Sequence, residues 1–233
     1  MHVKNILRRF GFDVIKYHDF YDAVVRPRNI RTMIDVGANI GLFAKEFRAR
    51  FPRIFIHSFE PLPSCFEQLE KTLPNDPHFK AWHTALGETA GEVVMHQSSF
   101  HPSSSLLPMA DLHRKLYPKS ATHTEVIVPM ARLDDVLANE NLEEPIMMKL
   151  DVQGFEAHVL KGAPLTLART SVILCETSFL PLYEGQPLFA DIHNLLREHG
   201  FSYHGSYQRH FDPRTNTPIY EDSIFLKDAQ KTP

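Results

Sequence analysis

The 233-residue sequence predicts an α/β protein with a mostly parallel sheet, helices on both faces and a C-terminal antiparallel hairpin. Three observations predict this class. Short β-rich runs alternate with stretches of helical spacing, the first run ends in a glycine turn that leads into a helix, and the composition, 43% hydrophobic and 23% charged, is typical of globular domains. We expect the main domain to span residues 31–233, after a helical extension over residues 1–30.

The first half of the chain alternates predicted strands and helices. Strands are expected at residues 32–36, 54–59 and 79–85, helices at residues 42–51 and 64–73, and two further extended runs at residues 91–97 and 124–129. The first helix carries phenylalanines at helical spacing, and Ser64 can cap the second. The interval 98–123 is rich in Ser, Pro and His and is long for a connection, so we expect a lid-like loop there.

The second half continues the alternation and ends in two strands. Strands are expected at residues 146–150, 171–175, 201–207 and 219–226, and helices at residues 154–161 and 190–199. Gly162 and Pro164 end the first of these helices, and Gly200 ends the second. A turn-rich connection at residues 212–216 joins the last two strands, which predicts the antiparallel hairpin at the end of the sheet.

Acidic residues stand at or next to the carboxyl ends of four predicted strands. These residues are Asp35, Glu60, Asp151 and Glu176, and open α/β sheets bind ligands beyond that edge. Because an unpaired carboxylate inside a sheet is costly, we expect the four to meet in one cleft. Lys149 precedes Asp151 by two residues, so both leave the same face of their strand. This lysine needs an anionic partner, for which Asp35, Asp151 or Glu176 could serve.

The glycine turn after the first strand indicates a nucleotide-like ligand. Gly37 and Gly41 let the backbone turn tightly and approach a ligand, while Glu60 at the end of the next strand can bind both hydroxyls of a ribose. The dinucleotide pattern G-x-G-x-x-G is not met, because Asn39 replaces its second glycine and no third glycine follows. Asp35 suits the cationic end of S-adenosylmethionine better than a pyrophosphate. The residues of this turn therefore favour a ligand of this kind over a dinucleotide.

Several sequence blocks, in order along nearly the whole chain, resemble the FkbM family of S-adenosylmethionine-dependent methyltransferases. They are Asp35-Val36-Gly37-Ala38-Asn39-Ile40-Gly41, Phe59-Glu60-Pro61, Ala85-Leu86-Gly87, Lys149-Leu150-Asp151-Val152-Gln153-Gly154-Phe155-Glu156 and Val159-Leu160-Lys161-Gly162-Ala163. The resemblance implies a Rossmann-like methyltransferase fold and methyl transfer to a hydroxyl of a sugar, glycan or natural product. Gln153 and His83 depart from the family pattern, in which Glu and Asn are common at these positions.

Resemblance and position together imply a set of cofactor-binding residues. The methionine part is expected at Asp35, Gly37, Asn39 and Gly41, the ribose at Glu60 with Pro61, the adenine at the segment from His83 through Ala85 to Leu86, and a covering segment at Ser104 and Ser105.

Methyl transfer to oxygen is an in-line displacement in which a base or a metal ion at the acceptor oxygen is useful. We expect Asp151 and Glu176 to be the catalytic residues. Asp151 could also bind the cofactor. A divalent cation held by Asp151 and Glu176 stays open, as does simple pairing of these carboxylates with Lys149.

The remaining features exclude some classes of partner. The net charge of −3 and the lack of a basic stripe argue against nucleic acid. No apolar stretch is long enough for a membrane span and no signal peptide is recognisable, so we expect a cytoplasmic protein, although the basic amphipathic start at residues 1–10 could touch a membrane surface weakly. Cys65 and Cys175 are expected to be buried reduced thiols, and the 14 His show no metal-ligand spacing.

Two other functions stay open at this point. An NAD-dependent oxidoreductase is disfavoured by the glycine spacing, and a non-catalytic cofactor-binding scaffold would need no turnover. The identity of the small-molecule or glycan acceptor and the oligomeric state do not follow from the sequence.

Overall fold

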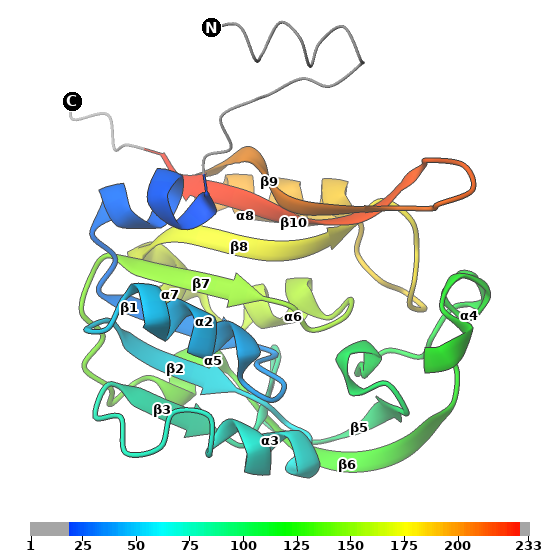
Figure 1. Cartoon of the computed structure of the whole chain (residues 1–233), viewed down its shortest axis with the longest axis horizontal. Helices are drawn as coiled ribbons and strands as arrows, with labels where there is room; N and C mark the ends of the chain where they lie inside the picture. Colours follow the sequence, from blue (N-terminus) through cyan, green and yellow to red (C-terminus); the bar gives the residue numbers. More distant parts are fainter. Residues whose placement is uncertain (1–18, 229–233) are drawn as a thin grey trace, which may run out of the picture.

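The computed structural model describes residues 19–228, which form two β-sheets with helices around the larger one (Figure 1). The strands of the large sheet are β1 (Thr32–Val36), β2 (Phe55–Phe59), β3 (Phe79–Trp82), β7 (Ile146–Leu150), β8 (Thr170–Ser178), β9 (Phe201–Phe211) and β10 (Pro218–Lys227). Their order is β3-β2-β1-β7-β8-β10-β9. In this sheet β10 alone runs antiparallel to its neighbours. The α/β class and the antiparallel hairpin are confirmed.

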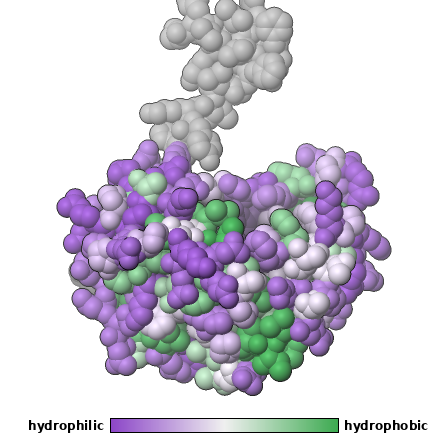
Figure 2. Space-filling model, turned by 60° about the horizontal axis from the view of Figure 1, so that its bottom comes forward, coloured by the Kyte–Doolittle hydropathy of each residue, from purple (hydrophilic) through white to green (hydrophobic). Residues whose placement is uncertain are grey.

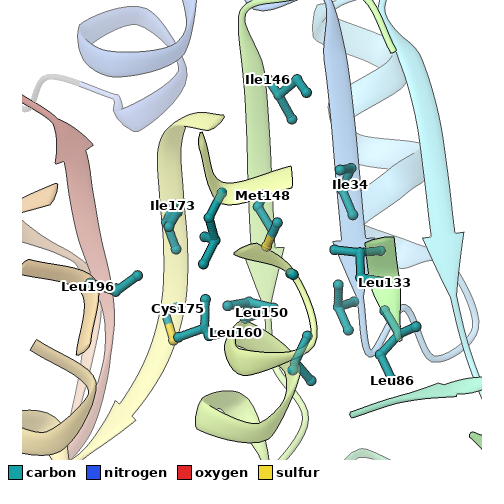
Figure 3. Packing of buried hydrophobic residues seen from close by; sticks show 14 of the residues in the cluster. Ile34, Leu86, Leu133, Ile146, Met148, Leu150, Leu160, Ile173, Cys175 and Leu196 are labelled. Carbon is teal, nitrogen blue, oxygen red and sulfur yellow. The ribbon is translucent and has the colours of Figure 1, made fainter. Parts of the chain in front are cut away.

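Helices cover both faces of the large sheet because its strands present apolar side chains to both sides. On one face lie the short helices η1 (Tyr21–Val25) and η2 (Arg26–Arg28) and the helix α2 (Leu42–Arg50). On the other face lie α5 (Leu133–Val136), α6 (Glu156–Lys161), α7 (Pro164–Arg169) and α8 (Phe189–Glu198). Successive residues of β1 alternate accordingly: Met33 packs with Phe47 of α2, whereas Ile34 joins the cluster that contains Leu196 of α8 (Figure 3).

A second, three-stranded sheet has the order β4-β6-β5 and lies beside the large one. It consists of β4 (Ala85–Leu86), β5 (Gly91–Ser98) and β6 (His123–Ala131), and α3 (Pro63–Leu69) packs near it. The prediction of one strand at residues 79–85 is wrong. The strand stops at Trp82, because Ala85 and Leu86 pair with Met130 and Ala131 of β6 instead of with β2.

The connection between β5 and β6 is an ordered segment with short helices of its own. These are η3 (His101–Ser103), α4 (Asp111–Leu116) and η4 (Pro118–Ser120). Bridges from Ser105 to His96 and from Met109 to Tyr183 fix it to β5 and to the segment after β8. Because Met109 and Tyr183 are also buried together, this connection is packed against the domain.

The structure corrects the prediction in two further places. The strand expected at residues 171–175 continues to Ser178, because β10 pairs with it as far as the contact between Tyr220 and Ser178. Glu176 therefore lies inside a strand and not after its end. The helix α7 was not expected from the sequence; it begins at Pro164, the residue that was taken only as a stop signal.

Other expectations concern the surface and the thiols. Cys65 and Cys175 are free and buried, as predicted. Between residues 19 and 228 no helix combines the length and the apolar character that crossing a bilayer requires. Figure 2 shows a largely hydrophilic surface with a few separate hydrophobic areas. The first 18 residues, which include the basic amphipathic start, lie outside the described part.

Candidate functional site

A cavity of about 560 Å³ opens at the carboxyl ends of β1, β2 and β7. This volume is in the range of small-molecule sites. Its walls come from the turn after β1, the end of β2, the segment before and in β4, the η3 segment, the end of β7 and the β9–β10 hairpin. Of the predicted residues, Gly37, Asn39, Glu60, Pro61, Ala85, Leu86, Ser104 and Asp151 line it.

The glycine turn is wedged between two strand ends. Gly37 has a φ of +76°, and a Cβ on it would lie 1.9 Å from the backbone oxygen of Asp151. The N–H groups of Gly37 and Ala38 both donate to the carbonyl of Phe59, at 3.1 and 2.9 Å. Only glycine fits this conformation and this close approach, so the turn is held against the ends of β2 and β7. Gly41, also at positive φ, begins α2 and does not line the cavity.

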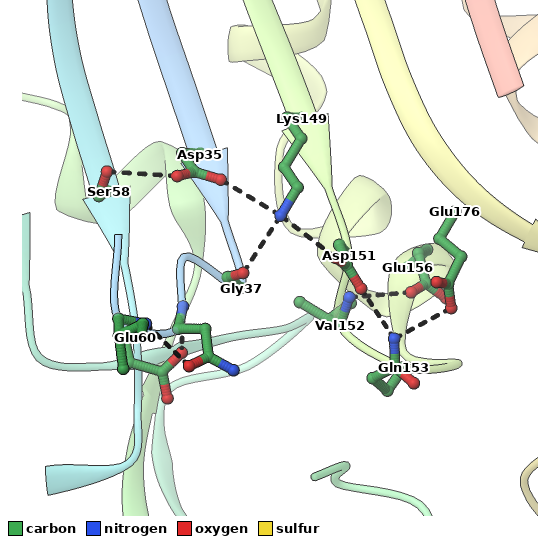
Figure 4. Close-up of polar contacts among 12 residues, drawn as sticks. Asp35, Gly37, Ser58, Glu60, Lys149, Asp151, Val152, Gln153, Glu156 and Glu176 are labelled. Carbon is green, nitrogen blue, oxygen red and sulfur yellow. Dashed lines mark hydrogen bonds and ion pairs between the residues drawn. The ribbon is translucent and has the colours of Figure 1, made fainter. Parts of the chain in front are cut away.

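Glu60 is a buried carboxylate that follows β2 and faces the cavity. Its Oε2 accepts the N–H of Asn39 at 2.8 Å, and its Oε1 accepts the N–H of Leu62 at 2.9 Å (Figure 4). Burial raises the pKa of Glu60 to about 7, against the opposing effect of these two N–H donors. Each oxygen keeps a second lone pair, so the group can still accept hydroxyl donors from a ligand.

Lys149 is held by acids at the floor of the cavity. Its Nζ lies 3.4 Å from Oδ1 of Asp35, 3.3 Å from Oδ2 of Asp151 and 3.2 Å from the carbonyl oxygen of Gly37. Burial opposes the charge of Lys149, but Asp151 and Asp35 together raise its pKa above the ordinary value. The predicted ion pair is confirmed with these two partners. Asp35 itself is fully buried beneath the cavity and does not line it.

Gln153 bridges the two predicted catalytic acids. Its Nε2 donates to Oδ1 of Asp151 at 2.8 Å and to Oε1 of Glu176 at 3.0 Å, and its Oε1 accepts the hydroxyl of Tyr183 at 2.8 Å. The hydroxyl of Ser105 donates to the Gln153 carbonyl at 2.7 Å. The amide nitrogen of Gln153 thus lies between the carboxylates of Asp151 and Glu176. Within residues 19–228 no group of three or more side chains could hold a metal ion. Glu176 does not line the cavity.

Of the other two predicted residues, Ser104 lines the cavity and His83 does not. Ser104 is buried, and its hydroxyl accepts the N–H of Ser98 at 3.0 Å, so it belongs to a fixed turn. His83 does not line the cavity: its ring stacks on Phe66 with centroids 4.5 Å apart, and its Nε2 contacts the carbonyl of Pro61 at 3.0 Å.

Three acids at or beside the cavity, Glu46, Glu156 and Asp222, were not proposed from the sequence. The Oε1 of Glu156 accepts the N–H groups of Val152 and Gly154, at 3.0 and 3.2 Å, and so holds the loop after β7. Burial raises the pKa of Glu156 to about 7. Asp222 lines the cavity from β10, directly opposite Glu176. The signal available for Asp222 was a pair of acidic residues, Glu221 and Asp222, within a predicted strand.

Comparison with known proteins identifies the family of this chain. Residues 35–203 match the Methyltransferase FkbM domain. The chain is 30% identical over 184 residues to methyltransferase sdnD of Sordaria araneosa, covering 69% of this chain and 70% of that protein. It is 27% identical over 175 residues to 2-O-methyltransferase NoeI of Sinorhizobium fredii, covering 70% of each. The solved structure of the StiE O-MT shares the fold, with a TM-score of 0.50 at 8% identity over 97% of this chain and 75% of that one. The chain therefore belongs to the FkbM family of methyltransferases.

Proposed function

We propose that this methyltransferase uses S-adenosylmethionine and transfers the methyl group to a hydroxyl oxygen of a neutral sugar, glycan or natural product. The observation that carries the proposal is Glu60. It is a buried carboxylate that faces the cavity, beside the glycine turn, with acceptor capacity left over after its two backbone contacts. Such an acid at the end of the second strand is the group that binds ribose hydroxyls in nucleotide-binding sheets.

The residues present fit this cofactor. In the proposal the ribose binds to Glu60, the adenine lies against Ala85 and Leu86 with Ser104 nearby, and the methionine part lies at the turn of Gly37 and Asn39. Pro61 lines the cavity next to Glu60, whereas Gly41, His83 and Ser105 do not line it and instead shape the turn, the end of β2 and the covering segment. Asp35 acts through Lys149, since its carboxylate is separated from the cavity by that side chain.

The cofactor supplies an electrophilic methyl group on a positively charged sulfur. Asp151 faces the cavity, and its contacts with Lys149 and Gln153 fix its carboxyl group close to the reacting groups. Glu176 supports this arrangement through Gln153. Burial, followed by the charge of Asp151, raises the pKa of Glu176 well above its ordinary value, and Glu176 does not line the cavity, so we assign it a positioning role. The divalent cation that the sequence left open is not part of the proposal.

The charges around the cavity support a neutral acceptor. Among the described residues that line it, Lys149 is the only lysine or arginine, and it is already paired with two carboxylates. The lining acids are Glu46, Glu60, Asp151 and Asp222. A phosphate or carboxylate on the acceptor would meet net negative charge there. The relative NoeI is named a 2-O-methyltransferase, which supports oxygen as the acceptor atom.

The cofactor is tested by thermal unfolding of ligand-free protein with S-adenosylmethionine, S-adenosylhomocysteine or NAD. A ligand at 100 times its dissociation constant adds about 2.7 kcal/mol, which raises the melting temperature by roughly 5 to 10 °C at this size. We expect the shift with the two adenosyl compounds and not with NAD. A shift with NAD alone would support the oxidoreductase and reject the proposal.

The acceptor is tested next with methyl-labelled S-adenosylmethionine and a panel of methyl glycosides, each with its phosphorylated counterpart. We expect label in the neutral glycosides only, with NMR of the product showing an O-methyl group. Cofactor binding without transfer to any compound offered would favour the scaffold, and transfer to the phosphorylated members would contradict the charge argument.

A further inference from the structure

Asp222 is an unpaired carboxylate at the cavity. It lies on β10, and the described residues, 19–228, provide it with neither a hydrogen-bond donor nor an ion-pair partner. The two neighbouring acids differ in this respect. Asp151 is engaged by Lys149 and Gln153, and Glu176 is engaged by Gln153. Asp222 is therefore the cavity-facing acid of this group whose acceptor oxygens are all left for a ligand.

The sheet places these three acids in one row. Lys149 lies beside Leu174 in the parallel pairing of β7 and β8. Two residues further along, Glu176 is still within β8 and Asp151 directly follows the end of β7. Asp222 is directly opposite Glu176 in the antiparallel pairing of β8 and β10. Because opposite residues share a face and alternate residues return to it, all three acids project on the same side of the sheet.

Asp222 lies at the far end of this row from Glu60. The order of strands is β2, β1, β7, β8 and β10, and the spacing of about 4.8 Å between neighbours puts β2 and β10 roughly 19 Å apart. Asp151 lies between them. A cofactor whose ribose binds to Glu60 thus reaches toward Asp151, which leaves the compartment at Asp222 for the acceptor. Phe43, Leu174 and Gln208 contribute to the same cavity.

A half-buried carboxylate without a partner, such as Asp222, destabilises the fold. Burial, followed by the charge of Asp151, raises the pKa of Asp222 to about 6. Proteins keep such unfavourable groups mainly at functional sites, where a ligand supplies the missing partner. A carboxylate with this pKa is ionised at neutral pH and can still accept a proton, which is the requirement for a general base.

We propose that Asp222 binds the acceptor hydroxyl and takes its proton during methyl transfer; this inference rests on the function proposed above. The hydroxyl donates to a carboxylate oxygen of Asp222. As the bond between the acceptor oxygen and the methyl carbon forms, the bond between that carbon and sulfur breaks, and the hydroxyl proton passes to Asp222. The sulfonium becomes the thioether of S-adenosylhomocysteine. Asp222 then releases the proton to water.

Binding of two cofactor analogues tests this without an acceptor. Sinefungin carries an ammonium group in place of the methylated sulfonium, whereas S-adenosylhomocysteine is uncharged at that position. If Asp222 faces the transferred methyl, calorimetry at pH 8 shows that the wild type binds sinefungin about tenfold more tightly than S-adenosylhomocysteine. The preference fades as the pH falls through about 6, because Asp222 becomes protonated there.

Asp222→Asn is the decisive variant. It loses most of the preference for sinefungin, while its affinity for S-adenosylhomocysteine changes less than twofold. The matched control is Asp111→Asn, which changes an 88% exposed side chain on α4 and keeps the preference. With any methyl glycoside that the wild type methylates, Asp222→Asn lowers kcat by roughly 10²- to 10⁴-fold.

A melting curve shows whether Asp222 is instead structural. The asparagine variant removes an unpaired, half-buried charge, so at pH 8 it melts at or above the temperature of the wild type. A lower melting temperature, an unchanged preference for sinefungin in the variant, or no preference in the wild type overturns the role of Asp222 and leaves the proposed function intact. Failure of the wild type to bind either analogue overturns the proposed function, and this inference with it.

Discussion

Replacement of Glu60 by Gln tests the ribose site with little change in shape. In the wild type the two carboxylate oxygens accept the N–H groups of Asn39 and Leu62 at 2.8 and 2.9 Å. Glutamine has one acceptor oxygen, so its amide N–H₂ faces one of these donors. The variant therefore weakens both the loop and the bonds to a ribose. Loss of one charged hydrogen bond to the ribose, at about 1.5 to 3 kcal/mol, predicts that S-adenosylhomocysteine binds roughly 10- to 150-fold more weakly at pH 8.

The dependence of the affinity for S-adenosylhomocysteine on pH gives a second test of the role of Glu60. Ribose hydroxyls donate to the ionised form of Glu60, so affinity depends on the fraction ionised. With the pKa of Glu60 at about 7, that fraction and the wild-type affinity rise about tenfold between pH 6 and pH 8. In Glu60→Gln this rise disappears, because the side chain no longer titrates. Isothermal titration calorimetry at pH 6, 7 and 8 measures both effects.

Glu156→Gln is the matched control for this experiment. Glu156 is also buried, with its pKa raised to about 7, but its Oε1 accepts both backbone N–H groups and it does not line the cavity. Its glutamine variant keeps that oxygen, so the affinity and its tenfold rise are expected to persist. An unchanged affinity of Glu60→Gln at pH 8, or a wild-type affinity that is flat from pH 6 to 8, would refute the assignment of Glu60 to the ribose.

Three further predictions concern stability. Gly37→Ala places a Cβ 1.9 Å from the Asp151 carbonyl oxygen at a φ of +76°. Urea unfolding should therefore show that the free energy of unfolding falls by more than about 2 kcal/mol. An unchanged unfolding midpoint would contradict the close approach. Lys149→Met leaves the fully buried Asp35 without its cation, so the free energy of unfolding should fall by about 3 to 5 kcal/mol. A fall below about 1 kcal/mol, which is typical of a surface ion pair, would count against a buried ion pair. The raised pKa of Glu156 means that the folded state holds its proton more tightly than the unfolded state, so the stability it contributes is complete below its ordinary pKa and is lost as the pH rises through about 7. Glu156→Gln should therefore melt above the wild type at pH 8 and lose this part of the pH dependence, and a lower melting temperature would show that the carboxylate is needed in its charged form.

The local sequence was sufficient to predict those elements whose structure depends on residues close together in the chain. The strands at Thr32–Val36 and Ile146–Leu150 occur at the predicted residues, because short apolar runs bounded by turn residues pair wherever a sheet forms. The turn at Gly37 was predictable because glycine favours positive φ, whereas the close approach of the Asp151 carbonyl oxygen depends on the fold. An anionic partner for Lys149 was also predictable, because a lysine in an apolar strand is stable only when it is paired.

The sequence by itself therefore determined the α/β class, the family and the presence of acids at one edge of the sheet. Tertiary structure decided which of these acids face the cavity. Asp35 and Asp151 share Lys149, Gln153 separates Asp151 from Glu176, and Asp222 joins the row only because β10 inserts between β8 and β9. Strand order and register depend on contacts between residues far apart in the chain, and spacing along one sequence carries little information about them.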